Sequence, residues 1–278
     1  MSEEKEMTFL DHLEELRWHL MRSFTVIFVF MIVAFVGAEW IFSNVVFAPA
    51  KADFITFRYL CDFSNWVGLG DKLCVVDIPF KVQSRLMTGQ FMMQLTASFV
   101  IGLIFGFPYL CWELWKFIRP GLHNKEQKKS RGVVSIVSFL FLLGIAFGYF
   151  IVTPMTVYFL STYSISDIVV NEFDITSYVS TVVSLVFGSG ALFQLPVIIY
   201  FLTKIGLVTP HFLRKYRKHS IVIILIIAAI VTPPDPFSQT IIAIPLYMLF
   251  EISIFISERV YKRKLREEQE EELKSSRV

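Results

Sequence analysis

Residues 107 to 126 read FPYLCWELWKFIRPGLHNKE, an apolar stretch with a proline, two tryptophans and a glutamate that runs directly into a basic loop. The apolar part belongs to a longer segment, 91 to 117, and about 20 apolar helical residues are enough to cross a bilayer. The whole chain has 278 residues, of which 55% are hydrophobic and 29 are phenylalanine, and its mean hydropathy is +0.59. This composition indicates a membrane protein.

The apolar segments predict an all-α polytopic protein with six transmembrane helices. They cover about 24–47, 91–117, 132–153, 177–203, 220–232 and 239–257. The last two are short and closely spaced, so a re-entrant hairpin is the alternative; we favour two short spans, because a bilayer thins around a short helix at modest cost. The predicted domains are a cytoplasmic amphipathic N-terminal helix (1–23), a transmembrane domain (24–257) and a charged cytoplasmic tail (258–278).

Basic residues predict the orientation of the spans. The chain has 26 Lys and Arg residues, and only five of them lie in the long connection 48–85, with none in the connections between spans three and four or five and six. The others flank the spans on the opposite side. Since Lys and Arg are enriched in cytoplasmic loops, both termini are predicted to be cytoplasmic, and this requires an even number of spans.

Three prolines fall inside predicted spans, namely Pro108, Pro196 and Pro245. Each lacks a backbone N–H donor, so each is expected to kink its helix. Three kinked helices predict a concave bundle. Simple tolerance of proline by membrane helices is an equally good explanation of any single one.

Ionisable and polar residues within spans are the first candidates for function. Glu113 and Glu251 lie close to the ends of their spans, and Lys116 is within one helical turn of Glu113. A headgroup-level position explains each glutamate as well as a functional role does. Gln194 lies near the middle of its span, where contact with another helix is the favoured interpretation.

Asp235 directly precedes a proline, which is typical of a helix cap at the start of span six. Gln239 follows one turn later. The five histidines form no metal-binding pattern, and the sequence has no phosphate-binding loop or catalytic triad, so we predict no metal site, no cofactor and no enzyme. A net charge of +2 gives no support for a nucleic-acid partner.

Two of the three cysteines, Cys61 and Cys74, lie in the predicted non-cytoplasmic segment 48–85. We hypothesise that they form a disulfide, which is compatible with an oxidising compartment. Two unpaired cysteines remain nearly as good an interpretation.

Three motifs in order resemble the TatC family, the multispanning subunit of the Sec-independent twin-arginine protein translocase. The first precedes span one and comprises His12, Leu13, Glu15, Leu16, Arg17 and Leu20. The second comprises Phe107, Pro108, Trp115, Phe117, Ile118, Pro120, Gly121, Leu122 and Glu126. The third is TPPDPFSQT at 232–240, followed by AIPLYMLFEI at 243–252.

The resemblance implies a receptor for signal peptides with an Arg-Arg pair, which exports folded proteins across the bacterial inner membrane with the protonmotive force. It implies that Glu15 and Glu126 hold the arginines and that Arg17 and Phe117 border the site. It further implies family-motif or partner-contact roles for Leu20, Pro49, Gln194, Asp235 and Gln239. The family often has glutamate where this chain has Gln194.

The implied partners are single-span TatA-type and TatB-type subunits, other copies of this chain and membrane lipid. The competing interpretation is a proton-coupled secondary transporter, which requires ionisable residues deep in the membrane. A membrane assembly factor is a third.

Overall fold

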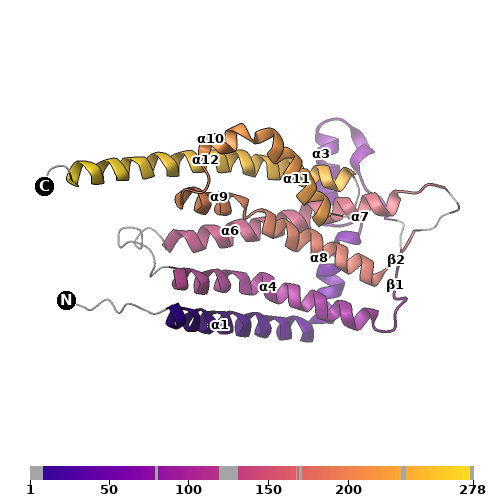
Figure 1. The fold of residues 1–278 in the computed structure, drawn as a ribbon. Helices are drawn as coiled ribbons and strands as arrows, with labels where there is room; N and C mark the ends of the chain where they lie inside the picture. Colours follow the sequence, from indigo (N-terminus) through magenta and orange to yellow (C-terminus); the bar gives the residue numbers. More distant parts are fainter. Residues whose placement is uncertain are drawn as a thin grey trace. The chain divides into compact units, whose positions relative to one another are not determined.

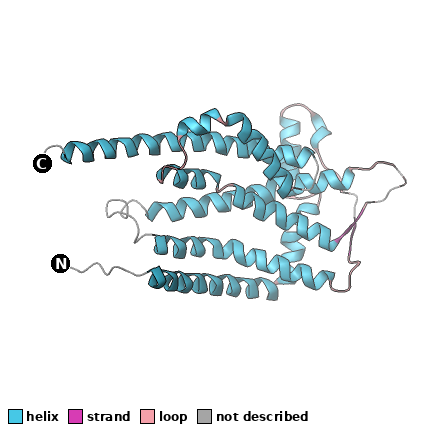
Figure 2. Ribbon diagram, in the orientation of Figure 1, coloured by secondary structure: helices cyan, strands magenta, loops and turns pink. Residues whose placement is uncertain are grey.

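The computed structural model describes residues 9–78, 81–118, 131–166, 168, 171–232 and 236–275, and helix dominates these ranges (Figure 2). The chain divides into two compact units. The first contains 1–48, 80–142 and 172–183, and the second contains 49–79, 143–171 and 184–278.

The first unit is built on two long helices, α1 (Phe9–Val36) and α4 (Gly89–Ile118), which lie side by side (Figure 1). Beyond α1 come the short helix α2 (Ala38–Ile41) and a π-helical turn, η1 (Phe42–Val46). The unit also includes the first part of α6 (Arg131–Phe147) and the start of α8 (Ile175–Leu192). Tyr178 of α8 donates a hydrogen bond to the carbonyl of Val46 at 2.9 Å.

The division expected at residue 23 is absent from α1. A surface helix over 1–23 followed by a separate span was predicted, whereas one continuous helix runs from Phe9 to Val36. The physical reason is local, because this stretch contains neither proline nor glycine to interrupt the helical hydrogen bonds.

Two short strands also join the first unit, which the all-helical prediction did not include. The strands β1 (Lys81–Gln83) and β2 (Glu172–Asp174) pair in parallel, with Val82 opposite Phe173. Polar side chains reinforce the pairing, because Gln83 donates to Glu172 and the backbone N–H of Arg85 donates to Asp174.

The second unit begins in the 3₁₀ turn η2 (Ala48–Ala50) and contains α3 (Ile55–Trp66) and a second 3₁₀ turn, η3 (Gly70–Leu73). The end of α6 continues through a π-helical turn, η5 (Gly148–Val152), into α7 (Thr153–Thr162). The remaining helices are α9 (Leu195–Lys204), α10 (Pro210–Lys215), α11 (Arg217–Val231) and α12 (Pro236–Ser275).

The core of the second unit is apolar and forms around α12. This helix packs against α9, α10 and α11, and its buried side chains include Ile242, Leu246, Phe250 and Ile254. Two hydrogen bonds between hydroxyl groups add polar contacts inside the core. The hydroxyl oxygens of Thr156 and Ser238 are 2.7 Å apart, and those of Thr203 and Ser257 are 2.8 Å apart. The predicted tail is not a separate element, because residues 258–275 continue α12.

Five helical segments are long and apolar enough to span a membrane within the described residues. They are Leu13–Val36, Gly89–Ile118, Gly132–Thr162, Ile175–Lys204 and Ser238–Arg266. The predicted fifth span, 220–232, falls in α11, which has only 15 residues. Of the three prolines, Pro108 and Pro245 lie inside continuous helices, whereas Pro196 follows the break between α8 and α9.

Candidate functional site

A pair of glycines brings α1 and α4 close together. A Cβ atom added to Gly102 would lie 2.7 Å from the carbonyl oxygen of Ile27, and one added to Gly106 would lie 2.6 Å from the Cγ1 atom of Ile27. Both distances are shorter than ordinary Cβ contacts, so a larger residue at either position would require Ile27 or its backbone to shift. The spacing of the two glycines is that of the small-xxx-small contact between membrane helices, in which the missing side chains allow the backbones to approach.

This contact aligns the beginning of α1 with the end of α4, where Glu113 is buried. Its side chain is 1% exposed. Nδ1 of His19 lies 2.5 Å from one carboxylate oxygen, and Nζ of Lys116 donates to the other at 3.1 Å. The hydroxyl of Tyr109 is a further hydrogen-bond partner. A buried carboxylate needs such partners, because burial removes its hydration.

The second nitrogen of His19 faces Glu15, one turn earlier on α1. The distance from Nε2 of His19 to the nearer carboxylate oxygen is 3.9 Å. The ring of Phe117 meets the ring of His19 edge-on, with centroids 6.4 Å apart. His19 therefore connects Glu15, Phe117 and Glu113 in one cluster, which we call the His19 cluster.

The two carboxylates of the cluster, Glu15 and Glu113, differ in how far their side chains are exposed to solvent. The side chain of Glu15 is 36% exposed, so it can meet a ligand from solution, whereas Glu113 is sealed. A carboxylate that is partly shielded from water binds a guanidinium group more strongly than one in bulk water, and it can do so with two parallel hydrogen bonds. The cluster is thus suited to holding an arginine at Glu15.

One expected member of the site, Arg17, is not brought to it. Arg17 is exposed and, two residues beyond Glu15, lies about 200° around the helix from it. Glu126, a second expected member, is outside the described residues. The sequence prediction missed His19, whose only signal was its one-turn spacing from Glu15, and it treated Glu113 as an edge residue of uncertain use.

The family model for the Sec-independent protein translocase protein TatC matches residues 11–245. The TatC protein of a Blattabacterium from Periplaneta americana is 40% identical over 264 residues, which are 95% of this chain and 99% of the relative. That of Halalkalibacterium halodurans is 32% identical over 96% of this chain and 97% of the relative.

The chain belongs to the TatC family.

A crystal structure of the twin-arginine translocase receptor TatC has the same fold. It is 29% identical in sequence and covers 90% of this chain and 99% of its own, with a TM-score of 0.68. A second crystal structure of that receptor, in DDM, gives a TM-score of 0.70. The resemblance drawn from the sequence motifs is therefore confirmed, and as a TatC protein this chain is a multi-pass bacterial membrane protein and a protein-transport component, not an enzyme.

Leu20 directly follows His19 on α1 and is partly buried. The other TatC-motif residues lie farther along the chain, and Pro49 is buried in η2. Gln194 stands directly before α9, at the break that precedes Pro196. Gln239 donates from its amide to the carbonyl of Leu225 at 2.9 Å. Asp235, the predicted helix cap, is outside the described residues.

Glu251 also has a structural partner. Arg217 donates to its carboxylate at 2.7 Å, and Tyr247 donates at 3.1 Å. This pairing joins α11 to α12 within the second unit. Because both members of the Arg217 pair are about one-third to one-half exposed, they contribute at most about 1 kcal/mol to stability.

Proposed function

We propose that this chain is the subunit of a twin-arginine translocase that receives signal peptides with an Arg-Arg pair and, with the protonmotive force, exports folded proteins. Membership of the TatC family supports the proposal, as does the shared fold with the crystal structure of a twin-arginine translocase receptor. The observation that carries it is Glu15, a partly buried carboxylate 3.9 Å from the imidazole of His19, which in turn meets the ring of Phe117.

In this proposal, Glu15 holds one signal-peptide arginine and Glu126 holds the other. A guanidinium group matches a carboxylate in two-pronged geometry, which an ammonium group cannot do. The receptor should therefore distinguish Arg-Arg from Lys-Lys although the charge is equal. Phe117 supplies an apolar wall that excludes water from one side of the contact.

The proposed topology has six spans with both termini in the cytoplasm, in a concave bundle. The five long helical segments supply five spans, and α11 supplies the remaining short one, which is the fifth along the chain. Local thinning of the bilayer compensates for the 15-residue length of α11. TatA-type and TatB-type subunits and further copies of this chain are the proposed partners, in the bacterial inner membrane. A green fluorescent protein fused to the C-terminus should fluoresce, and its failure to do so while the fusion is present in the membrane would contradict a cytoplasmic C-terminus.

The receptor role is tested with the full-length protein in nanodiscs and a fluorescent signal peptide. Glu15→Gln should weaken binding of the Arg-Arg peptide by about 10- to 100-fold, because hydrogen bonds to charged groups contribute about 1.5–3 kcal/mol. The matched control is Glu14→Gln, which removes a neighbouring exposed carboxylate from α1. Equal binding of the Arg-Arg and Lys-Lys peptides by the unmodified protein would refute the proposal.

A further inference from the structure

The solvent-facing side of α3 is divided lengthwise into an apolar half and a polar half. The apolar half carries large exposed side chains, of which Trp66 is 83% exposed, and its members are Ile55, Tyr59, Phe63, Trp66 and Val67 just past the helix end. The polar half carries Arg58, Asp62 and Asn65, all exposed. At about 100° of rotation per residue, the apolar residues cover about 120° of the helix and the polar residues the adjoining sector.

The opposite side of α3 is fixed within the second unit. Phe57 is 1% exposed and packs against Tyr158, with ring centroids 5.9 Å apart. Phe54, directly before the helix, stacks on Phe150 at 6.1 Å. The exposed side of α3 therefore cannot be turned inward without breaking these contacts.

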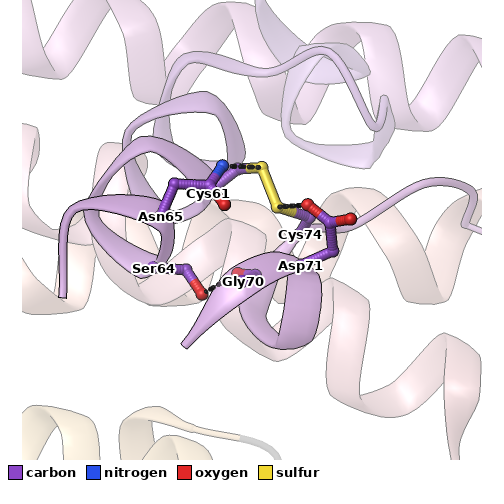
Figure 3. Close-up of a disulfide and its surroundings, with 6 residues drawn as sticks. All are labelled: Cys61, Ser64, Asn65, Gly70, Asp71 and Cys74. Carbon is purple, nitrogen blue, oxygen red and sulfur yellow. Dashed lines mark hydrogen bonds between the residues drawn. A yellow bond between two sulfur atoms is a disulfide. The ribbon is translucent and has the colours of Figure 1, made fainter. Parts of the chain in front are cut away.

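A disulfide and a short hydrogen bond hold the far end of α3. Cys61 is bonded to Cys74, and the hydroxyl of Ser64 donates to the carbonyl of Gly70 at 2.5 Å (Figure 3). Asp71 and Asn65 flank the two sulfur atoms in the same view. The segment after α3 is therefore attached to the helix at Cys61 and Ser64, which lie outside the apolar half. Within the described residues, it leaves the apolar half uncovered.

α3 begins beside the later part of a candidate span. Phe54, directly before α3, contacts Tyr149 and Phe150, and Phe57 of α3 contacts Tyr158; all three partners belong to the candidate span Gly132–Thr162. About 20 helical residues cross the hydrocarbon core, and counted from the beginning of this span they end close to residue 152. Tyr and Trp are the residues that concentrate at this depth, because one part of each side chain is apolar and the other binds water.

We propose that α3 is an interfacial helix that lies in the plane of the membrane surface, with the half formed by Ile55, Tyr59, Phe63, Trp66 and Val67 inserted into lipid at the boundary between headgroups and acyl chains. The polar half then faces the aqueous side. An amphipathic helix of this kind binds through its buried apolar area. The lipid-facing half anchors the segment between the first two spans, and this assignment does not depend on signal-peptide binding.

The experiment uses the full-length protein in bilayers and the fluorescence of Trp66. Because the chain has four other tryptophans, the emission of Trp66 is obtained by subtracting the emission of the Trp66→Phe protein from that of the unmodified protein. Phospholipids brominated near the headgroup end of their acyl chains should quench this difference signal, and acrylamide in the water should quench it only weakly. Lipids brominated at the bilayer centre should quench it less than the first set.

Two probes one residue apart on α3 provide the matched comparison. In the Trp66→Phe protein, Phe63→Trp places an indole in the apolar half, and Asp62→Trp places one in the polar half. The first should be quenched by brominated lipid and the second by acrylamide. The proposal would be overturned if acrylamide quenched the emission of Trp66 and brominated lipids did not. It would also be overturned if neither quencher reduced the emission, because protein would then cover Trp66.

Discussion

The hydrogen bond between His19 and Glu113 should be one of the strongest contacts between α1 and α4. Its two atoms are 2.5 Å apart, and the two side chains are 12% and 1% exposed, so water can replace neither partner. A hydrogen bond to a charged group contributes about 1.5–3 kcal/mol, and removing one member of a buried ion pair costs about 3–5 kcal/mol. We therefore expect strong coupling between the two residues.

A double-mutant cycle of His19→Phe and Glu113→Leu measures this coupling. The phenyl ring retains the contact with Phe117, and leucine approximately fills the volume of the glutamate. Glu113→Leu alone should lower the free energy of unfolding by about 3–5 kcal/mol, because it leaves His19 and Lys116 without their acceptor. The double variant should be about 1.5–3 kcal/mol more stable than the sum of the single effects predicts.

Unfolding of the purified full-length protein in mixed micelles, followed by circular dichroism as the proportion of denaturing detergent rises, provides the measurement. The matched control is a second cycle with Lys116→Gln. Lys116 is 43% exposed, so water replaces much of its interaction and its coupling to Glu113 should be below about 1 kcal/mol. Additive effects of the His19 and Glu113 variants, within about 0.5 kcal/mol, would refute the reasoning.

Three further predictions concern the helix contact, the strand pair and the disulfide. Gly102→Ala should separate α1 from α4 and lower the melting temperature, because the added methyl carbon would lie 2.7 Å from the backbone of Ile27. Gly132→Ala is the control and should not destabilise the protein, because a Cβ atom there has no neighbouring atom within 4 Å. Equal melting temperatures of the two variants would contradict this prediction. The pKa of Asp174 is held below its usual value by the hydroxyl and backbone N–H of Thr176 and the backbone N–H of Arg85. Its contribution to stability should be complete above about pH 4 and lost as the pH falls through its depressed pKa, and Asp174→Asn should remove this part of the pH dependence from hydrogen exchange at β1 and β2. Replacement of both Cys61 and Cys74 by serine should lower the free energy of unfolding by about 3 kcal/mol, since the cross-link closes a short loop; full alkylation of both thiols in the unreduced protein would show that the bond is absent.

The membrane class, five of the six predicted spans and the family followed from linear patterns. Apolar runs long enough to cross a bilayer are visible without a fold, because each helix satisfies its own backbone hydrogen bonds and interacts with lipid residue by residue. The missing N–H donor predicted a kink at each of three prolines, but only Pro196 follows a helix break, whereas Pro108 and Pro245 lie inside continuous helices. Three motifs in order, the first of them around Glu15, identified the TatC family before any contact was known.

Other features depended on neighbours that linear patterns do not show. The continuity of α1 through residue 23 and of α12 through the charged tail was missed, because a change from apolar to charged residues marks a change of solvent and does not end a helix. The pairing of β1 with β2 joins segments separated by 89 positions, as in the contact of Gln83 with Glu172.

Apolar runs and motifs in the linear sequence identify a helical membrane protein of the TatC family with an acidic residue, Glu15, before its first predicted span. The surroundings of Glu15 depend instead on how the helices pack. The close approach of α1 and α4 at Gly102 and Gly106 brings Glu113 to His19, and His19 to within 3.9 Å of Glu15. Such a cluster depends on the distance and rotation between two helices, which side-chain packing sets and hydropathy does not encode.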